Sequence, residues 1–536
     1  MIKIIKRVLF SIILSVFLVS GLHAQSTYTA AGCTQAQIQT AVDAEQVSPA
    51  DGDVIAIPSA SPCTWTGTAN ITQTFSNSVT IQGAGAVSST AGGASTTGTD
   101  NTEIIDDTTG GKGIFSITTV SGKSFRITGI AIIQNSSSVV EGGGEIYLAG
   151  HSASVRVDHC HIYSYVSGNF GVQVTDNVLG VADHNFFDNL PGIVTNNFSI
   201  NNGKAWQGAS DGYGDQSWVD TDHWGTSQFW YIEDSRFNYG WANDCHNGGR
   251  YVYRYSTFIN VNGLANHGLH DTARSCRASE LYMNTFSGSS GITSGGGALA
   301  NNGGPTLAWG NTVSYYNSVL NLAIVRQSSD PYAQTYPPNG WGYCGTQQQQ
   351  SNGLNEDSSW DGNYNTTTGY PCLDAPGRGA GDLRTGTNFP NFVNSVLGGQ
   401  TWLREALDPI YVWDNTVSNL STGIIGDTTI SGTLLDNRDY YQQFGAYGES
   451  GTFNGTKGVG QGLYSAIPST CTGGTDPKTG GPAPGVGYWA TDQNTLYVCN
   501  PTNTWTAYYT PYTYPHPLTG SGSPPNPPTN VQAVGH

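Results

Sequence analysis

The sequence predicts an all-β protein built as a solenoid, in which short strands stack coil upon coil. The chief observation is an eight-residue pattern that ends on an apolar side chain and recurs seven times. The closing residues are Ile162, Phe187, Phe237, Phe258, Phe286, Val313 and Val417. Their spacing is about 25 residues or a multiple of it, a period typical of solenoid repeats, which bury their apolar faces only by stacking. The composition agrees, because abundant Gly, Ser, Thr and Asn favour turns and strands over helices.

The first 24 residues predict a secretory signal peptide. The chain begins Met-Ile-Lys-Ile-Ile-Lys-Arg, continues with an apolar run from Val8 to about Leu22, and reaches a small-residue cleavage site before Gln25. No later stretch has the length and apolarity of a membrane span. We therefore expect an exported, extracellular protein.

The remaining segments follow in order along the chain. Residues 25–75 are expected to form an N-terminal cap, and 76–440 the solenoid. A long insertion at about 326–400 breaks the period with Gln, Pro and Gly. Residues 441–518 contain aromatic runs that predict a small C-terminal unit, which could cap the last coil or bind glycan, and a Pro-rich tail fills 519–536.

Nine cysteines in an exported chain are expected mostly to pair. Neighbours along the sequence give Cys33–Cys63, Cys245–Cys276, Cys344–Cys372 and Cys471–Cys499. Cys160 is left over. It lies two residues before a closing apolar residue, in a column otherwise made of Asn185, Ser235, Ser256, Asn284, Asn311 and Asn415. This column predicts an inward polar ladder at a turn, with Cys160 buried and inert.

Two repeats carry a family resemblance. Val155-Arg-Val-Asp-His-Cys-His-Ile162 and Gly180-Val-Ala-Asp-His-Asn-Phe-Phe187 resemble the V-W-I-D-H coil signature of pectate lyases. The repeats as a whole resemble the right-handed parallel β-helix of the pectin-lyase-like superfamily, over roughly 75–440. The chain lacks the Arg-x-Pro-x-x-Arg motif of pectate lyases and the spaced Asp-Asp-His-Gly set of polygalacturonases, so no catalytic residue is carried over.

Strand alternation predicts one outward column on the repeats. Its members are Asp158, Asp183, Glu233, Arg254, Tyr282, Trp309 and Trp413. Aromatic rings and charges in a row suit a sugar-binding track, to which Glu233, Arg254, Tyr282 and Trp309 would contribute. The alternative is an ordinary solvent face with pairs between coils such as Glu233–Arg254.

A denser set of histidine, aspartate, arginine and tryptophan residues lies at 215–280. For β-elimination on a uronic acid, His270 or His246 could be the base and Arg274 or Arg250 the group that neutralises the carboxylate, with an optional Ca²⁺ on Asp220 and Asp222. For hydrolysis, the carboxyl pair would be Asp222 and Asp244. Trp218 and Trp224 are candidate substrate contacts. The alternative is that these groups cap turns and pair on a polar flank.

Three function classes remain open at this point. A secreted carbohydrate-active enzyme, a polysaccharide lyase before a glycoside hydrolase, explains the residue set at 215–280. A glycan-binding or adhesive surface protein explains the outward column and the missing motifs. A structural, self-associating subunit of an extracellular assembly fits the Gly, Asn and Thr content and the aromatic C-terminal region. The expected partner is a polysaccharide or cell-surface glycan, and no cofactor beyond the optional Ca²⁺ is required. A formal net charge of −18 makes nucleic acid an unsuitable partner.

Overall fold

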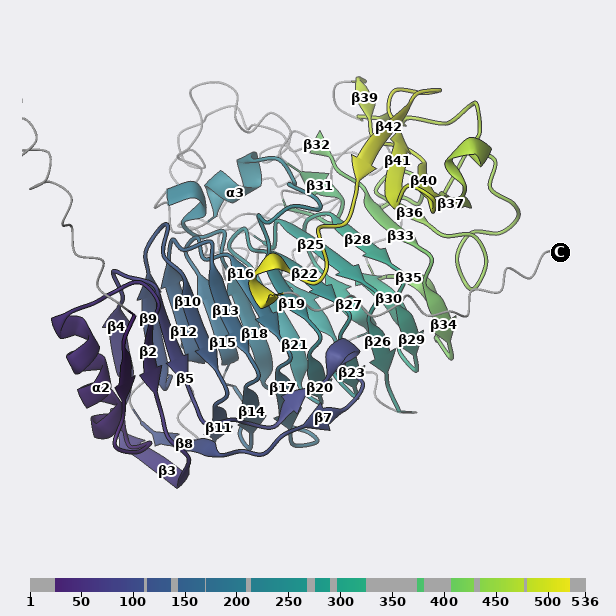
Figure 1. Ribbon diagram of the computed structural model, residues 1–536. Helices are drawn as coiled ribbons and strands as arrows, with labels where there is room; N and C mark the ends of the chain where they lie inside the picture. The colour runs from purple at the N-terminus through teal and green to yellow at the C-terminus, as the bar shows by residue number, and fades with distance from the viewer. Residues whose placement is uncertain are drawn as a thin grey trace, which may run out of the picture.

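The computed structural model is a three-sheet parallel β-helix (Figure 1). It describes residues 25–109, 113–135, 143–168, 170–208, 214–267, 275–289, 296–323, 374–379, 406–428, 434–476 and 480–520. The predicted signal peptide at 1–24, most of the predicted insertion at 326–400 and the tail beyond residue 520 lie outside these ranges. The predicted all-β solenoid is confirmed, because strands of neighbouring coils pair in parallel in all three sheets.

Each sheet gains one strand per coil in the described part of the chain. Sheet A consists of β1 (Thr27–Thr29), β2 (Asp53–Ala56), β5 (Val79–Gln82), β10 (Phe125–Thr128), β13 (Val155–Asp158), β16 (Gly180–Asp183), β19 (Trp230–Glu233), β22 (Arg250–Arg254), β25 (Ala278–Tyr282), β28 (Thr306–Trp309), β33 (Ile410–Trp413) and β36 (Tyr440–Gln442). Sheet B consists of β3 (Ala60–Gly67), β8 (Thr102–Thr108), β11 (Ala131–Gln134), β14 (His161–Ser164), β17 (Phe186–Asn189), β20 (Arg236–Asn238), β23 (Thr257–Ile259), β26 (Thr285–Ser287), β29 (Thr312–Ser314) and β34 (Thr416–Ser418). Sheet C consists of β4 (Ile71–Thr74), β9 (Phe115–Thr119), β12 (Gly144–Gly150), β15 (Phe170–Thr175), β18 (Asn196–Asn201), β21 (Trp241–Cys245), β24 (Leu264–Asn266), β27 (Gly297–Asn301), β30 (Ser318–Leu322) and β35 (Gly423–Asp427).

Each coil runs through sheet C, sheet A and sheet B in that order. Alternate residues of every strand point into the β-helix, where they stack in columns. In the column Phe187, Phe237, Phe258 and Phe286, consecutive ring centroids are 4.9, 4.8 and 4.2 Å apart. This spacing follows from the distance of about 4.8 Å between neighbouring strands. The closing apolar residues of the sequence pattern are therefore core residues.

The turn from sheet A to sheet B contains the predicted polar ladder. A residue with positive φ, such as His184, comes first, and the ladder residue follows it. Asn284 Oδ1 accepts a hydrogen bond from the backbone N–H of Ser256 at 3.0 Å, and Asn311 Oδ1 accepts one from Asn284 at 3.1 Å. Each coil thus satisfies a buried N–H of the coil before it. The predicted inward column is confirmed.

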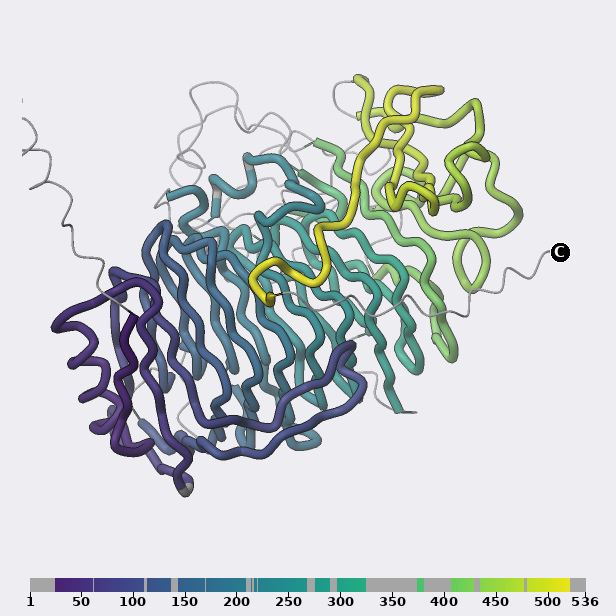
Figure 2. The backbone as a smooth tube through the Cα atoms, in the orientation of Figure 1, coloured from purple at the N-terminus to yellow at the C-terminus, as the bar shows by residue number. Residues whose placement is uncertain are grey.

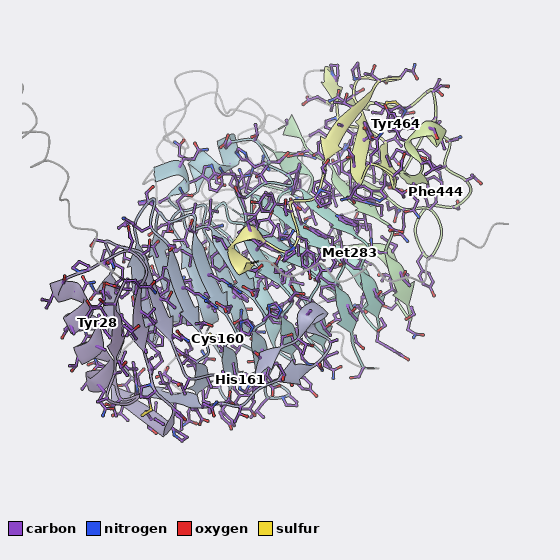
Figure 3. All side chains as sticks on the ribbon, in the orientation of Figure 1. Tyr28, Cys160, His161, Met283, Phe444 and Tyr464 are labelled. Atoms are coloured by element: carbon purple, nitrogen blue, oxygen red, sulfur yellow. A yellow bond between two sulfur atoms is a disulfide. The ribbon has the colours of Figure 1, made fainter. Side chains whose placement is uncertain are left out.

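Cysteine pairing follows sequence order where the structure describes it. Cys160 is buried and is the one cysteine of the described ranges outside a disulfide (Figure 3). Burial raises the pKa of its thiol to about 12, as expected for an inert side chain. Cys344 and Cys372 lie outside the described residues. The confirmed disulfides are Cys33–Cys63, Cys245–Cys276 and Cys471–Cys499.

These three disulfides fit an extracellular protein. Among the described helices, none has the length and apolarity to cross a membrane.

The segment predicted as an N-terminal cap contains a full coil as well as the cap. Its strands β1 and β2 belong to sheet A, β3 to sheet B and β4 to sheet C. Helix α2 (Gln35–Val47) packs against β1, β2 and β4, and buries Ile38, Ala41 and Val42 at this end of the core. The β-helix therefore begins before residue 76, because the capping helix is inserted into the first coil.

The connection between β5 and β8, residues 83–101, runs along the β-helix to later coils (Figure 2). It contains β6 (Ser88–Ser89), η1 (Ala91–Gly93) and β7 (Thr96–Thr97). The Gly92 N–H donates to Asp234 Oδ1 at 2.7 Å, and Thr257 Oγ1 donates to the Gly92 carbonyl at 2.8 Å. These bonds tie an early coil to the middle of the solenoid.

The C-terminal unit packs on the outer face of sheet A. Its strands β37 (Val459–Gly462), β40 (Gly487–Ala490), β41 (Thr495–Cys499) and β42 (Trp505–Tyr509) form one sheet. The chain then continues over sheet A to η5 (Pro517–Thr519), which contacts β16 (Figure 1). The interface is an apolar cluster that includes Tyr231 and Trp413 from sheet A and Trp489 and Tyr509 from the unit. The unit thus covers the side of the β-helix and is more than a cap on its last coil.

The outward column of sheet A is buried, most of it beneath this unit. Its seven members, Asp158, Asp183, Glu233, Arg254, Tyr282, Trp309 and Trp413, are at most 7% exposed. The prediction of a solvent-facing sugar track at Glu233, Arg254, Tyr282 and Trp309 is therefore wrong. Strand alternation does turn these side chains away from the core, but a segment far along the chain covers them.

Candidate functional site in the loops between sheets C and A

The described site candidates gather where the chain leaves sheet C and enters sheet A. One of these loops, between β18 and β19, contains η2 (Trp206–Gly208) and α3 (Asp215–Val219). His246 follows β21, and Arg250 begins β22 one short loop later. His270 and Arg274 belong to the next loop and lie outside the described residues.

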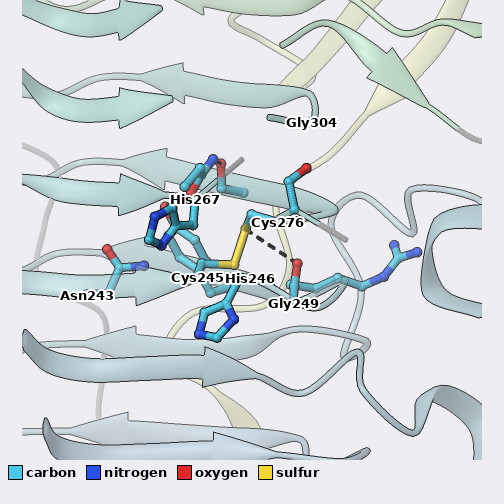
Figure 4. The surroundings of a disulfide bond; sticks show 12 residues. Asn243, Cys245, His246, Gly249, His267, Cys276 and Gly304 are labelled. Atoms are coloured by element: carbon cyan, nitrogen blue, oxygen red, sulfur yellow. Dashed lines mark hydrogen bonds between the residues drawn. A yellow bond between two sulfur atoms is a disulfide. The ribbon is translucent and has the colours of Figure 1, made fainter. Parts of the chain in front are cut away.

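The Cys245–Cys276 disulfide joins two of these loops (Figure 4). His246 forms an antiparallel bridge with Ser275, and the Gly248 N–H donates to the Ser275 carbonyl at 2.9 Å. The His246 N–H also donates to the Ile200 carbonyl at 3.1 Å, so the backbone at His246 is held by both neighbouring coils. These contacts fix the position from which the His246 side chain extends.

Asp244 and His267 form a pair on the outward side of sheet C. His267 Nδ1 lies 3.1 Å from Asp244 Oδ1, and the two side chains are 30% and 17% exposed. Burial opposes ionisation of Asp244, but the charge and the hydrogen bond of His267 outweigh it and lower the pKa of Asp244. The pair is therefore a half-buried carboxylate that orients an imidazole, reachable from solvent.

His246 lies beside this pair. Its ring centroid is 6.1 Å from that of His267, and the rings are nearly perpendicular. Asn247 Nδ2 is 3.2 Å from His246 Nδ1 and also 3.2 Å from Asn201 Oδ1. Two imidazoles and one carboxylate are thus brought together.

Arg250 is not available to a substrate. Its side chain is fully buried, with the guanidinium carbon 4.6 Å from the ring of Trp206. It donates to the carbonyls of Thr221, Asp222 and Ser217 at 2.9, 2.6 and 2.7 Å. Burial, followed by the charge of Arg277, lowers the pKa of Arg250 to about 9. The prediction that Arg250 neutralises a uronate is wrong, because this arginine holds the loop backbone instead.

Asp222 belongs to a second cluster, nearer sheet A. Arg277 Nη2 lies 2.6 Å from Asp222 Oδ1, and Arg277 Nη1 lies 3.5 Å from Asp408 Oδ2. The Tyr508 hydroxyl donates to Asp408 Oδ1 at 3.1 Å. Burial, followed by the charge of Asp222 and a hydrogen bond with it, raises the pKa of Asp408 well above its ordinary range. The structure therefore pairs Asp222 with Asp408, and not with Asp244 as expected for a hydrolase.

Asp220 and Asp222 do not form a calcium site together. Asp220 Oδ2 accepts hydrogen bonds from Trp206 Nε1 at 3.1 Å and Gln207 Nε2 at 2.6 Å. His223 Nε2 also lies within hydrogen-bond distance of it, at 3.0 Å. Burial opposes ionisation of Asp220, but the hydrogen-bond donors outweigh burial and lower the pKa of Asp220 far below its ordinary value. The predicted ligand pair is wrong, since donors occupy one carboxylate and Arg277 the other. Within the described ranges no group of three or more His, Cys, Asp or Glu could hold a metal ion.

The two tryptophan candidates serve packing more than binding. Trp218 is fully buried, and its Nε1 donates to the Ser275 carbonyl at 2.9 Å, so its predicted role as a substrate contact is wrong. Trp224 is half-buried and donates to the Tyr508 hydroxyl at 3.2 Å. Trp224 thus links this loop to the C-terminal unit.

Two members of these clusters, Asp408 and Tyr508, were not candidates in the sequence. Asp408 precedes β33 and Tyr508 lies in β42, each far along the chain from Asp222. No local motif marks them. His267 and Arg277 lie inside the histidine- and arginine-rich stretch at 215–280, and that composition was the one signal by which they could have been selected.

Comparisons with known proteins assign neither a family nor a site to this chain. No family model matches the sequence, and no curated protein matches it. Among solved structures, an alginate lyase from Paenibacillus sp. strain FPU-7 is similar at 12% identity and a TM-score of 0.24, covering 57% of this chain and 83% of that one. This similarity is too low to assign site residues between the two chains.

Proposed function

We propose that this protein is an exported polysaccharide lyase that cleaves a uronic-acid-containing glycan by β-elimination. The observation that carries the proposal is the Asp244–His267 pair, with His246 beside it, on the outward side of sheet C. In β-elimination a base removes the proton next to the uronate carboxylate, and the leaving oxygen then departs. A carboxylate that holds Nδ1 of a histidine presents the other ring nitrogen for proton transfer.

The roles follow from position. His267 is the proposed base, Asp244 is the positioning residue that fixes its orientation, and His246 is the proposed second group at the same sugar. A cation must also neutralise the uronate, and the buried Arg250 does not serve. Arg274 keeps this proposed role from the sequence, with added Ca²⁺ as the alternative, so the test is run with and without Ca²⁺.

Hydrolysis is less well supported. Glycosidases use two carboxyl groups about 5–5.5 Å apart when retaining, or about 6.5–9.5 Å apart when inverting. Asp222 and Asp408 instead share one cation, because Arg277 Nη2 lies 2.6 Å from Asp222 Oδ1 and Arg277 Nη1 lies 3.5 Å from Asp408 Oδ2. Asp244 is engaged by His267 and Asp222 by Arg277, so the expected Asp222–Asp244 pair has no common target.

A role as a glycan-binding surface has lost its main support. The aromatic and charged column that would have bound sugar lies under the C-terminal unit.

The test is incubation of the secreted form with a panel of uronic-acid polysaccharides, with and without Ca²⁺. Ultraviolet absorbance of unsaturated uronate and reducing ends are both measured. We expect His267→Gln to lose about 10²–10⁴-fold in rate, the usual contribution of a general base, and Asp244→Asn to fall in the same direction. The matched control is His161→Gln, which alters another histidine held through Nδ1 by an aspartate, Asp100 at 2.9 Å, but on sheet B.

Each outcome supports or excludes one of the candidate activities. Absorbance that depends on His267 but not on His161 supports the lyase. Reducing ends without absorbance would show hydrolysis, and silence across the panel would overturn an enzymatic role on uronic acids.

A further inference from the structure

The C-terminal segment Trp505–Gly520 is attached to sheet A and the adjoining loop by hydrogen bonds to buried carboxyl groups. The four donor–acceptor pairs are Tyr508 Oη with Asp408 Oδ1 (3.1 Å), Tyr509 Oη with Glu280 Oε2 (2.9 Å), Tyr514 Oη with Asp234 Oδ1 (2.8 Å) and His516 N with Glu233 Oε1 (2.8 Å). Each of these carboxyl groups belongs to a residue at most 8% exposed. The attachment is therefore both polar and desolvated.

Cations do not balance this row of carboxyl groups. Arg254 pairs with Glu233 at 2.6 Å and donates to the carbonyls of Tyr512 and Thr513 at 2.9 Å each. Arg277 faces Asp408 from the other side. Four buried carboxyl groups thus face two guanidinium groups. Because an unpaired buried carboxylate is strongly unfavourable, docking of the segment requires bound protons.

Glu280 is the clearest proton holder. It is fully buried, and its Oε1 accepts from the Gly225 N–H at 2.8 Å. The charged and titratable groups that face it are Arg254, Tyr231, Tyr282 and Tyr509. Burial raises the pKa of Glu280 to about 7, although Gly225, Tyr509 and Arg254 oppose this.

His516 titrates in the opposite sense. It is 5% exposed, its ring centroid lies 5.0 Å from that of Tyr231, and its Nδ1 accepts from the Leu518 N–H at 3.2 Å. Burial, followed by the charge of Arg254, lowers the pKa of His516 to about 4, while Asp183 opposes this and Arg156 reinforces it. The docked segment therefore requires a neutral imidazole.

We propose that Trp505–Gly520 is a pH-sensitive latch, which docks on sheet A with Glu280 protonated and His516 neutral and loosens when either group becomes charged. The latch reaches the loop that carries Asp222, because Trp224 Nε1 donates to Tyr508 at 3.2 Å and Gly225 donates to Glu280. Loosening uncovers the stacked rings of Tyr282 and Trp309, whose centroids are 4.8 Å apart. The same event releases one wall of the loops between sheets C and A.

The sign of each dependence follows from linkage. Glu280 has an ordinary pKa of 4.5 and a docked pKa of about 7. Between these values opening releases one proton, so the Glu280 contribution to the opening constant rises about tenfold per pH unit, about 300-fold in all, and then levels. His516 has an ordinary pKa of 6.5 and a docked pKa of about 4. Between these values opening takes up one proton, so the His516 contribution to the opening constant falls about 300-fold as pH rises. The two contributions largely cancel where they overlap, so the wild-type constant is smallest near about pH 5.5 and rises only about threefold on either side.

Hydrogen exchange read by mass spectrometry measures the latch directly. Exchange of the 505–520 amides in the full secreted protein is followed from pH 4 to 8 and divided by the intrinsic rate at each pH. The wild-type opening constant relative to that of Glu280→Gln should rise about 300-fold between pH 4.5 and 7 and then level. Relative to His516→Gln, it should fall by a similar factor between pH 4 and 6.5. Other titrating groups cancel in these ratios.

The matched control is Glu145→Gln, another buried glutamate, which lies in β12 of sheet C, where its Oε1 accepts from Gln134 Nε2 at 2.9 Å. Its ratio should not change with pH. Ratios for Glu280→Gln and His516→Gln that stay within about threefold across the range would overturn the proposal. Should Glu280→Gln not fold, Tyr509→Phe removes a donor to the Glu280 carboxylate. In Tyr509→Phe the rise of the opening constant with pH must then continue above pH 7. A rise that levels at the same pH as in the wild type would also overturn the proposal.

Discussion

Arg254 and Glu233 form a fully buried ion pair between neighbouring coils, with Arg254 Nη2 2.6 Å from Glu233 Oε2. The pair lies in the outward column of sheet A, where β22 follows β19 in register. Arg254 also donates to the Tyr282 hydroxyl at 2.9 Å and to two carbonyls of the C-terminal segment. One guanidinium thus joins three coils to the end of the chain.

Removal of this guanidinium should be strongly destabilising. In Arg254→Met, Glu233 is left buried without its cation, and we expect a loss of about 3–5 kcal/mol in the free energy of unfolding. Urea unfolding of the two proteins measures the difference. The control is Lys123→Met, which breaks the Lys123–Asp51 pair, 35% and 58% exposed, and should cost about 0–1 kcal/mol. Equal losses in the two variants would contradict this account of the buried pair.

The polar ladder should be sensitive to loss of a single amide. In Asn311→Ala the buried N–H of Asn284 loses its acceptor, and the carbonyl of Leu281 loses a donor that lies at 2.8 Å. Each unsatisfied buried group costs about 1–3 kcal/mol, so the free energy of unfolding should fall by at least that amount. Asn454→Ala, at an exposed turn, should change it by less than about 0.5 kcal/mol. A ladder variant no weaker than the turn variant would show that water replaces the missing amide.

Two adjacent glycines separate a steric effect from backbone strain. Gly92 and Gly93 have φ values of 72° and 70°, so alanine is strained at both. A Cβ at Gly92 meets nothing within 4 Å, whereas one at Gly93 would overlap Ser235 and lie 2.6 Å from the Thr257 nitrogen. Gly93→Ala should therefore lower the melting temperature clearly more than Gly92→Ala and loosen residues 83–101 to protease. Equal melting temperatures would mean that this segment is not pressed against β20 and β23 in solution.

Acid should weaken the fold through Asp158. Burial opposes its ionisation, but hydrogen bonds from Arg126 and His159 outweigh this and lower the pKa of Asp158 well below its ordinary 3.8. A depressed pKa contributes stability that is present above pH 3.8 and lost as pH falls below it. Asp158→Asn should lower the melting temperature at pH 7 and reduce the further loss between pH 4 and 2.5. The exposed Asp107→Asn is the control, and parallel curves for all three proteins would count against the assignment.

Much of the fold followed from local pattern. The apolar period, the polar column at the turn and the even spacing of cysteines each reflect a repeating physical requirement. Every coil must place one side chain in the core, one amide at the turn and its strands in register with the last coil. These requirements act on neighbouring residues and neighbouring coils. The columns through Phe237 and Asn284 can therefore be predicted from the sequence alone.

The candidate site could be predicted only in part, because the repeat pattern predicts contacts between adjacent coils but not between distant segments. His246, Asp244 and His267 come from adjacent coils, so their meeting followed from stacking. By contrast, Asp222 meets Asp408 and Tyr508 across long stretches of chain. The sequence could nominate charged residues, but it did not indicate that Arg250 holds backbone carbonyls.

The sequence by itself determined the all-β solenoid, the pairing of the three described disulfides and the column of side chains that leaves sheet A outward. Only the tertiary structure decided whether that column meets water or protein. Strand alternation sets the direction of a side chain over a few residues, whereas the C-terminal unit that covers Glu233, Arg254 and Trp309 docks from far along the chain. Burial of such a surface depends on the packing of the whole chain, and the local repeat pattern does not predict it.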